Sequence, residues 1–113
     1  GSRPRAPRPS DPTPLAELAR PPRPPDGLRA LLRRHYPARA RAVGAEGHAR
    51  VRIRVSRDGE VRVLGALPGA SPLFTDACRR ALEEAAPFTP GLDRRGRRVV
   101  TVLPFRCTFT TVY

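Results

Sequence analysis

The chain has 113 residues and a formal net charge of +12, and all 22 of its basic residues are arginine. That length allows one domain and little more, and no apolar run approaches the roughly 20 residues that would span a bilayer. The basic balance favours acidic partners, such as nucleic acid, anionic lipid or acidic cell-wall polymers, and charge alone does not choose among them.

The first 25 residues form a proline-rich arm that holds nine of the 15 prolines. Such a segment buries too little apolar surface to offset its ordering entropy and favours polyproline II, so residues 1–25 are expected to be a stiff linker. A PxxP-type ligand is the alternative, and residues 15–19 are expected to form a single helical turn. Gly1-Ser2 resembles a scar of tag removal, so the natural protein is expected to extend further upstream.

Residues 26–113 are expected to fold as one small domain that begins with a helix. Asp26 is expected to cap this helix, which continues to about residue 34 with leucines at helical spacing. Tyr36-Pro37 ends it, because the residue before a proline is pushed out of the α region. A turn of helix and a loop are expected over residues 38–46.

An arginine-rich hairpin is predicted next, because from Gly47 the apolar residues recur at every second position. The apolar side chains of the first strand point one way. The side chains that point the other way are Arg50, Arg52 and Arg54. Asp58-Gly59 predicts the turn, and the second strand continues from Val61. This pair of strands therefore has one solvent-exposed, arginine-rich face.

A second helix is predicted from Ser71-Pro72, a cap followed by proline at the first helical position, and Pro87 stops it. Its apolar stripe comprises Phe74, Ala77, Cys78, Ala81, Leu82 and Ala85. Cys78 and Cys107 lack the paired spacing of zinc ligands. A disulfide between them would need an oxidising compartment, and we favour the alternative of two small buried apolar residues.

The last strand is predicted from residue 99 to about residue 109, after a basic loop at residues 88–98. Pro104 donates no hydrogen bond to a ladder, so one flank of this strand is expected to be an edge or a bulge. The expected fold is α+β, with two helices on one face of a small three-stranded antiparallel sheet in the order α-β-β-α-β.

Catalytic chemistry is not indicated. His35 and His48 are the only histidines and form no His-Glu-x-x-His pattern, and Glu83 and Glu84 diverge by about 100° on a helix. The sequence has no Gly-x-Ser-x-Gly elbow, P-loop or GxGxxG motif. We therefore expect no enzyme activity, no cofactor and no metal site.

Nucleic-acid binding is a weaker alternative. The arginines of the first strand have the charge to contact phosphates, but single-strand binders need aromatic stacking platforms on the same face. The aromatic residues are few, and most are expected in the core.

From Tyr36 to Phe109, the order and spacing of several short motifs resemble those of the TonB carboxy-terminal domain family. The motifs are Tyr36-Pro37, Glu46-Gly47, Val51-x-Ile53-x-Val55, Asp58-Gly59, Phe88-x-Pro90-Gly91, Gly96 and Pro104-Phe105. A proline-rich arm upstream is typical of such transducers. The sequence departs from the family at Ala86, where members often carry tryptophan.

The resemblance implies the periplasmic tip of an inner-membrane energy transducer whose motor partners act through the region upstream. Such a tip binds an extended segment of an outer-membrane protein by strand addition and transmits force from a proton-driven motor. The residues expected at the binding edge are Val99, Val100, Thr101, Val102, Arg106 and Thr108. Tyr36 and Pro37 correspond to a family element near the partner, and a core aromatic is the alternative for Tyr36.

A structural adaptor is the alternative function. Such an adaptor would dock on peptidoglycan or associate with copies of itself in an envelope-spanning machine, such as a motility complex. Its expected contacts with an anionic surface are Arg50, Arg52, Arg54, Arg94, Arg95, Arg97 and Arg98.

Overall fold

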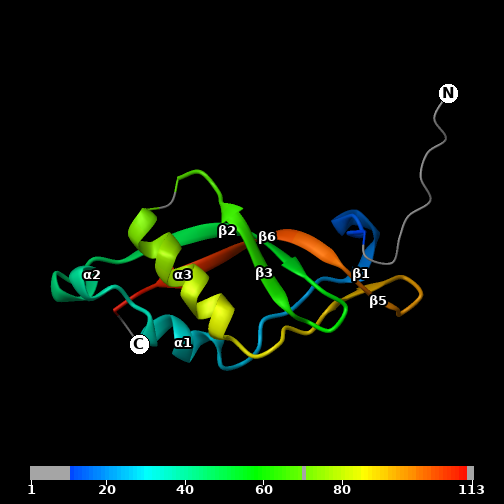
Figure 1. Cartoon of the computed structure of the whole chain (residues 1–113), viewed down its shortest axis with the longest axis horizontal. Coiled ribbons are helices and arrows are strands. Elements are labelled where there is room, and N and C mark those ends of the chain that lie inside the picture. Colours follow the sequence, from blue (N-terminus) through cyan, green and yellow to red (C-terminus); the bar gives the residue numbers. More distant parts are fainter. Residues whose placement is uncertain (1–10, 70, 112–113) are drawn as a thin grey trace.

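A computed structural model of the protein describes residues 11–69 and 71–111; residues 1–10, with Gly1-Ser2 and the start of the arm, lie outside the described part. The described chain forms two three-stranded antiparallel sheets and three α-helices (Figure 1), which confirms the expected α+β class. In chain order the elements are the 3-10 helix η1 (Leu15–Glu17), β1 (Leu18–Arg20), α1 (Leu28–Arg34), α2 (Ala38–Ala42), β2 (Gly47–Val55), β3 (Val61–Ala66), α3 (Pro72–Glu84), β4 (Gly91–Asp93), β5 (Arg98–Val99) and β6 (Thr101–Phe109).

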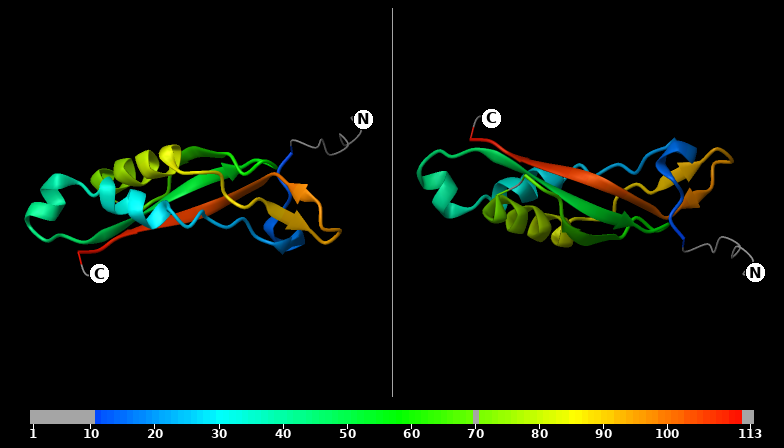
Figure 2. Two further views of the ribbon diagram at one scale, coloured as in Figure 1. Left: turned by 90° about the horizontal axis from the view of Figure 1, so that it is seen from below. Right: turned by 90° about the horizontal axis from the view of Figure 1, so that it is seen from above.

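The larger sheet has the strand order β3-β2-β6, so β2 lies in the middle and β6 at one edge. β2 pairs with β6 over its whole length, from Gly47 opposite Phe109 to Val55 opposite Thr101. Helices α1 and α3 both lie on one side of this sheet, as the two views of Figure 2 show. The expected packing of two helices on one face of a three-stranded sheet is therefore confirmed, and α2 supplies the turn of helix expected after Tyr36-Pro37.

Alternation along β2 separates the core from solvent. The inward side chains of this strand are fully buried and are Ala49, Val51, Ile53 and Val55. Between them, Arg50 and Arg52 are exposed. The buried face packs against the apolar stripe of α3 in a single core. A strand of period two and a helix of period 3.6 each contribute one apolar side, and this is why the sequence folds in two layers.

Helix α3 begins at the position that the sequence predicts. The Ser71 hydroxyl accepts a hydrogen bond from the Leu73 amide at 3.3 Å, and Pro72 occupies the first helical position, where its missing N–H is not needed. The helix ends at Glu84, ahead of Pro87. A side-chain cap therefore sets the start of this helix, and a nearby proline limits its end.

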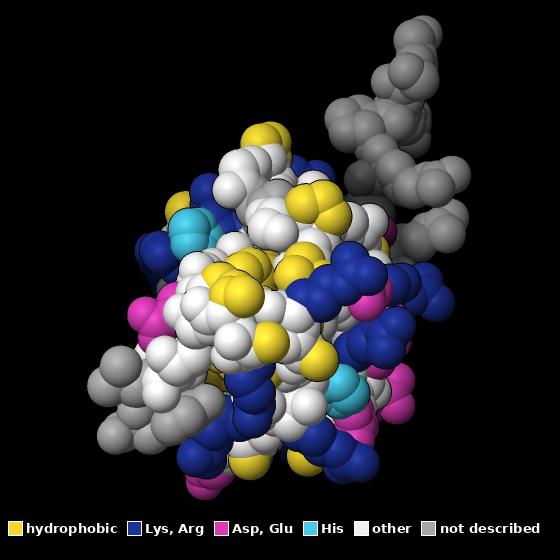
Figure 3. All heavy atoms as spheres, turned by 90° about the vertical axis from the view of Figure 1, so that its left-hand side faces the viewer, with side chains coloured by type: hydrophobic (Ala, Val, Ile, Leu, Met, Phe, Trp, Pro, Cys, Tyr) yellow, Lys and Arg dark blue, Asp and Glu magenta, His cyan; other side chains and the backbone are white. Residues whose placement is uncertain are grey.

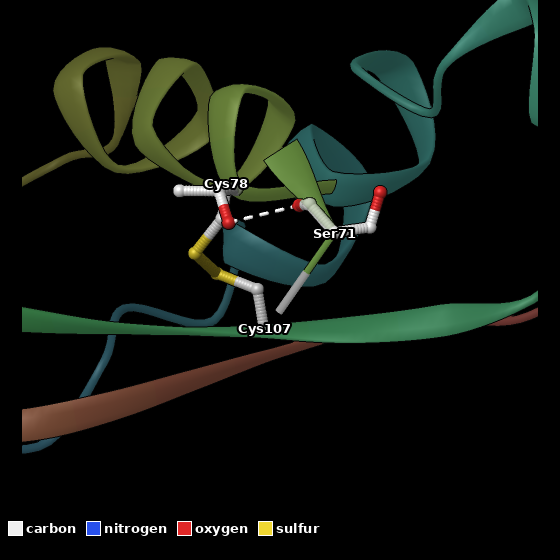
Figure 4. The surroundings of a disulfide bond; sticks show 4 residues. Ser71, Cys78 and Cys107 are labelled. Carbon is white, nitrogen blue, oxygen red and sulfur yellow. Dashed lines mark hydrogen bonds between the residues drawn. A yellow bond between two sulfur atoms is a disulfide. The ribbon is translucent and has the colours of Figure 1, made fainter. Parts of the chain in front are cut away.

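A disulfide joins Cys78 on α3 to Cys107 on β6, with 5.7 Å between the two Cα atoms (Figure 4). Both residues are fully buried, as expected, but the favoured interpretation of two unlinked cysteines is wrong. Separation along the chain does not give the distance between two side chains. These two cysteines meet because each lies on the inward side of its element and α3 packs over the sheet. The bond ties the helical layer to the edge strand.

The smaller sheet has the order β1-β4-β5 and lies where the sequence predicted a basic loop. β4 and β5 form a hairpin in which Gly91 lies opposite Val99. The Asp93 carboxylate accepts hydrogen bonds from the backbone amides of Arg97 and Arg95, both at 2.9 Å. The bond from the Arg97 amide is the largest cause of the lowered pKa of the Asp93 carboxyl. A side chain thus closes a turn between strands too short to show a pattern in the sequence.

The arm packs on the domain where the sequence predicted an extended linker. Its expected helical turn is present as η1, and β1 then pairs with β4. Arg23 exchanges two backbone hydrogen bonds with Thr89, of 3.0 and 2.9 Å, and Pro22 is buried. Residues 18–23 therefore differ from the expected spacer. Composition correctly indicated few apolar side chains, but backbone N–H and C=O groups pair with a strand edge whatever side chains they carry.

The predicted last strand is divided between the two sheets. Val99 belongs to β5, Val100 lies between strands, and β6 starts at Thr101. The Val100 carbonyl accepts a hydrogen bond from the Thr13 amide at 2.8 Å, so the arm contacts the chain at this break. The run of β-branched residues carries no local signal for the change of sheet, which depends on pairing with distant segments.

Candidate functional site

The backbone groups of β6 alternate between β2 and the outer edge of the sheet. The Arg50 carbonyl accepts a hydrogen bond from the Leu67 amide at 2.8 Å, on the β3 side of β2. In an antiparallel ladder the N–H and C=O of one residue point to the same side and successive residues alternate. Val51 therefore faces β6, where its partner is Phe105. The backbone groups of Phe105 therefore point toward β2. The N–H and C=O of Arg106, the residue after Phe105 in β6, point outward.

By the same alternation, the residues of β6 with outward backbone groups are Val102, Pro104, Arg106 and Thr108. Pro104 has no N–H, and it occupies a position where the ladder with β2 needs none. Over residues 11–69 and 71–111, no strand pairs with this outer flank. The outward N–H and C=O groups therefore form a template for a further strand.

A hollow of about 950 Å³ lies beside the carboxy-terminal half of this edge, between β6 and α1. We call it the edge groove, and the residues that define it here are Leu28, Arg29, Leu32, Arg106, Thr108 and Phe109. Arg106 and Thr108 line this groove and also have outward backbone groups, so the open edge and the groove form one continuous surface. Helix α1 supplies the facing wall with two leucines four positions apart.

The sequence did not predict that α1 forms one wall of the edge groove. Leu28 and Leu32 indicated a helix, but their spacing alone does not say which element faces that helix. The signal present in the sequence was Arg29 between them, because an arginine beside two leucines at helical spacing marks the border of an apolar stripe. In the structure Arg29 is exposed.

Tyr36 is a core residue that also lines the edge groove. Its side chain is 7% exposed, and its ring packs edge-on against Phe74 and Phe109. The hydroxyl donates a hydrogen bond to the Ala45 carbonyl at 2.5 Å. Pro37 beside it is half-buried. The core alternative thus describes most of the contacts of Tyr36, and one side of the residue faces the groove.

Three of the six residues expected at the edge lie elsewhere. Val99 pairs with Gly91 in the smaller sheet, and Val100 is buried at the break between strands. Thr101 is fully buried, and its backbone faces Val55 of β2. The structure therefore brings together only Val102, Arg106 and Thr108 on the open flank.

The expected anion-contacting arginines fall into two groups. Arg50, Arg52 and Arg54 project from the face of the larger sheet opposite α1 and α3. The other group lies in and beside the turn between β4 and β5 and comprises Arg94, Arg95, Arg97 and Arg98. In this second group, Arg97 forms an ion pair with Asp93 at 3.0 Å, and Arg94 donates a hydrogen bond to a carbonyl of η1.

A smaller hollow of about 400 Å³ lies at the α2 end of the molecule, where Leu73 is partly exposed. Figure 3 faces this end and shows hydrophobic side chains surrounded by arginines. Close by, Glu84 receives a hydrogen bond from His35 and forms an ion pair with Arg34 at 3.1 Å. The pKa of the Glu84 carboxyl is lowered, first by the hydrogen bond from His35 and then by the charge of Arg34. These contacts join the carboxy-terminal ends of α1 and α3.

The described residues contain no group of three or more His, Cys, Asp or Glu side chains that could hold a metal ion. His35 lies at the end of α1, whereas His48 lies in β2. None of the helices in the same part of the chain has both the length and the apolar character needed to cross a membrane.

Comparison with known families matches residues 33–111 to the family described as Gram-negative bacterial TonB protein C-terminal. The matched region includes the open edge of β6 and both cysteines, whereas the arm and most of α1 precede it. The comparison with curated proteins gave no match. Domains of this family are non-enzymatic parts of energy transducers and lie in the periplasm of Gram-negative bacteria. The chain belongs to the TonB carboxy-terminal domain family.

Proposed function

We propose that the domain is the periplasmic tip of a TonB-like energy transducer, and that it binds an extended segment of an outer-membrane protein by adding that segment to β6. The observation that carries this proposal is the outward flank of Val102, Arg106 and Thr108, whose N–H and C=O groups no described strand pairs. Backbone hydrogen bonds would supply affinity, because any extended peptide can form them.

Side-chain selectivity would come from the edge groove. Alternate side chains of an added strand point to opposite sides, so every second one would face α1. Leu28 and Leu32 offer apolar contacts on that side, and Arg29 offers a cationic one. The side chain of Arg106 lies on the opposite face of the sheet, toward which the remaining side chains of the added strand would point. A segment with apolar residues at alternate positions and an acidic residue nearby fits this lining.

The pairing of β6 suits a domain that transmits force. Nine consecutive residue pairs join it to β2, and the hydrogen bonds of an antiparallel ladder lie perpendicular to the strands. A pull along the added strand therefore loads many bonds together. The disulfide between Cys78 and Cys107 carries load from β6 to α3 as well. Such a bond persists in an oxidising compartment, which the periplasm is.

An NMR titration tests the proposal directly. Isotope-labelled protein would be titrated with synthetic peptides covering the extended periplasmic segments of candidate outer-membrane proteins. Peptides that bind by calorimetry should shift the amide signals of Val102, Arg106 and Thr108 together with those of Leu28 and Leu32. Binding that leaves the β6 amides unchanged would show that the partner docks elsewhere.

Self-association is the second candidate, because the same open edge would also accept β6 of another copy. Analytical ultracentrifugation of the whole chain over a range of concentrations distinguishes the two functions. A dimer that a bound peptide dissociates would assign the edge to the peptide, whereas a dimer that excludes the peptide would favour the adaptor function.

A further inference from the structure

The face of the larger sheet opposite the helices carries a cluster of arginines. Helices α1 and α3 lie on the other side of this sheet (Figure 2). We call this surface the arginine face, and its arginines are Arg50, Arg52, Arg54, Arg62 and Arg106. Four of the five are exposed and Arg54 is half-buried. Three adjacent strands contribute, so the charge spreads over the sheet instead of following one strand.

Like charges lie directly opposite each other on this face. Arg50 is the cross-strand partner of Arg106, and Arg54 is the partner of Arg62. Like charges at paired positions of an antiparallel ladder destabilise it. In the described part of the chain, Arg50, Arg62 and Arg106 form no ion pair with a carboxylate. An external anion would relieve this repulsion, because its charge is opposite to that of the arginines. Local arrangements that oppose stability are expected at functional surfaces.

The arginine face has the features of a surface that binds phosphates in a plane. Neither of the two hollows described above is lined by Arg50, Arg52 or Arg62, so these guanidinium groups stand on an open sheet and not in a cradle for one small molecule. The planar guanidinium donates two parallel hydrogen bonds to a phosphate, a geometry that an ammonium group lacks. Repeated phosphates on an extended surface would match this arrangement.

Aromatic side chains are missing from the same face among the described residues. The rings of Tyr36, Phe74 and Phe109 contact one another beneath the helices, and Phe88 contacts Phe105. Proteins that bind single-stranded nucleic acid stack its bases on aromatic rings beside their basic residues. The composition of the arginine face therefore favours a partner recognised by charge and phosphate geometry alone.

We propose that the arginine face binds the anionic phospholipid headgroups of a bilayer. The family is periplasmic, so the domain lies between two membranes. Clustered arginines on a surface are attracted to anionic lipids by roughly one kcal/mol each, which is about a fivefold change in affinity per residue. Bilayer binding by this face would leave the helices pointing away from the membrane and hold the open edge of β6 alongside it. Of the arginines on this face, only Arg106 also belongs to the open edge, so the other four bind lipid independently of strand addition.

Vesicle co-sedimentation of the whole chain tests this proposal. The probes are vesicles of phosphatidylcholine alone and vesicles with about one-third phosphatidylglycerol. The test variant is Arg50→Ser/Arg52→Ser/Arg62→Ser, which spares the residues of the edge groove. The charge-matched control is Arg20→Ser/Arg39→Ser/Arg95→Ser, which removes three exposed arginines from other elements. Thermal unfolding of each variant confirms that it folds.

We expect the wild-type chain to bind the anionic vesicles and not the neutral ones, and added salt to weaken that binding. The test variant should bind on the order of 100-fold more weakly, and the control less than about tenfold more weakly. Equal losses in both variants would show that net charge alone drives binding and would overturn the proposal. Unchanged vesicle binding by the test variant would overturn it too. If that variant instead loses binding to purified peptidoglycan or to an oligonucleotide, the face belongs to that partner.

Discussion

Gly59 and Phe88, which lie 29 residues apart, meet backbone to backbone at the turn between β2 and β3. The Phe88 amide donates a hydrogen bond to the Gly59 carbonyl at 2.8 Å. Gly59 has a φ of +85°, and a Cβ added there would lie 1.9 Å from the Phe88 carbonyl oxygen. The Asp58-Gly59 and Phe88-x-Pro90-Gly91 motifs therefore contact each other. This contact holds the chain in place just before it enters β4 of the smaller sheet.

Replacing Gly59 by alanine should destabilise the domain by more than about 2 kcal/mol, because the left-handed conformation costs about 1–2 kcal/mol and the contact with Phe88 adds to it. Urea unfolding measures the change. Gly44→Ala is the matched control: its φ is +66°, but nothing lies within 4 Å of the added Cβ, so only the conformational cost applies. Equal losses at the two positions would show that the Phe88 contact contributes nothing.

Thr101 is a buried residue whose hydroxyl has no hydrogen-bond partner among residues 11–69 and 71–111. An unsatisfied buried hydroxyl costs roughly 1–3 kcal/mol, and valine has nearly the same shape without it. Thr101→Val should therefore raise the free energy of unfolding by about 1 kcal/mol in chemical denaturation. Thr101→Ser keeps the hydroxyl and removes a methyl group, so it should be destabilising. A loss of stability in the valine variant would mean that the hydroxyl is satisfied in solution.

The disulfide should contribute about 2–4 kcal/mol to the free energy of unfolding, because it closes a loop of 29 residues in the unfolded chain. Urea unfolding with and without a reductant measures this contribution. The double variant Cys78→Ala/Cys107→Ala should be less stable than the oxidised wild type and insensitive to the reductant. A wild-type protein with the same stability in both conditions would contradict the proposed link between α3 and β6.

The contact of Glu84 with His35 and Arg34 should make stability depend on pH. The pKa of the Glu84 carboxyl is lowered in the folded protein, so the folded state favours its ionised form. The resulting stabilisation is present above the unfolded-state pKa, near 4.5, and is lost as the pH falls through the lower folded-state value.

Between about pH 6 and pH 3, Glu84→Gln should therefore lose less stability than the wild type, as measured by urea midpoints. Glu83→Gln is the control, because it removes the neighbouring carboxylate without touching His35 or Arg34, and it should follow the wild type. Parallel pH profiles for Glu84→Gln and the wild type would contradict the interpretation.

The elements that could be predicted from the sequence are those whose signals are local. The alternation of β2, the Ser71-Pro72 cap and the Asp58-Gly59 turn each lie within a few residues, and the structure has all three. The pairing of β1 with β4 and the Cys78–Cys107 bond depend on segments that are distant in sequence, so no local pattern indicated them. The hairpin of β4 and β5 is local, but its strands are too short to show a pattern. The division of residues 99–109 between two sheets also depends on distant segments, and it places Val99 and Val100 off the edge. Thr101 lies in β6, but its backbone faces β2.

For a related reason, the sequence did not predict that α1 forms one wall of the candidate site. Leu28 and Leu32 define a helical face, but only the packing of α1 against α3 and β6 directs that face to the open edge. Pro104, in contrast, indicated an edge strand from its chemistry alone, and β6 is indeed the edge strand of its sheet.

The most direct measurement concerns the backbone N–H of Thr108, which points outward from β6. Thr108→Pro removes this donor without removing any bond to β2, whereas Thr108→Ala removes the side chain and keeps the donor. For a receptor peptide that binds the wild-type chain, calorimetry should show binding at least about tenfold weaker in the proline variant and nearly unchanged binding in the alanine variant. Equal affinities of the proline and alanine variants would contradict strand addition at β6.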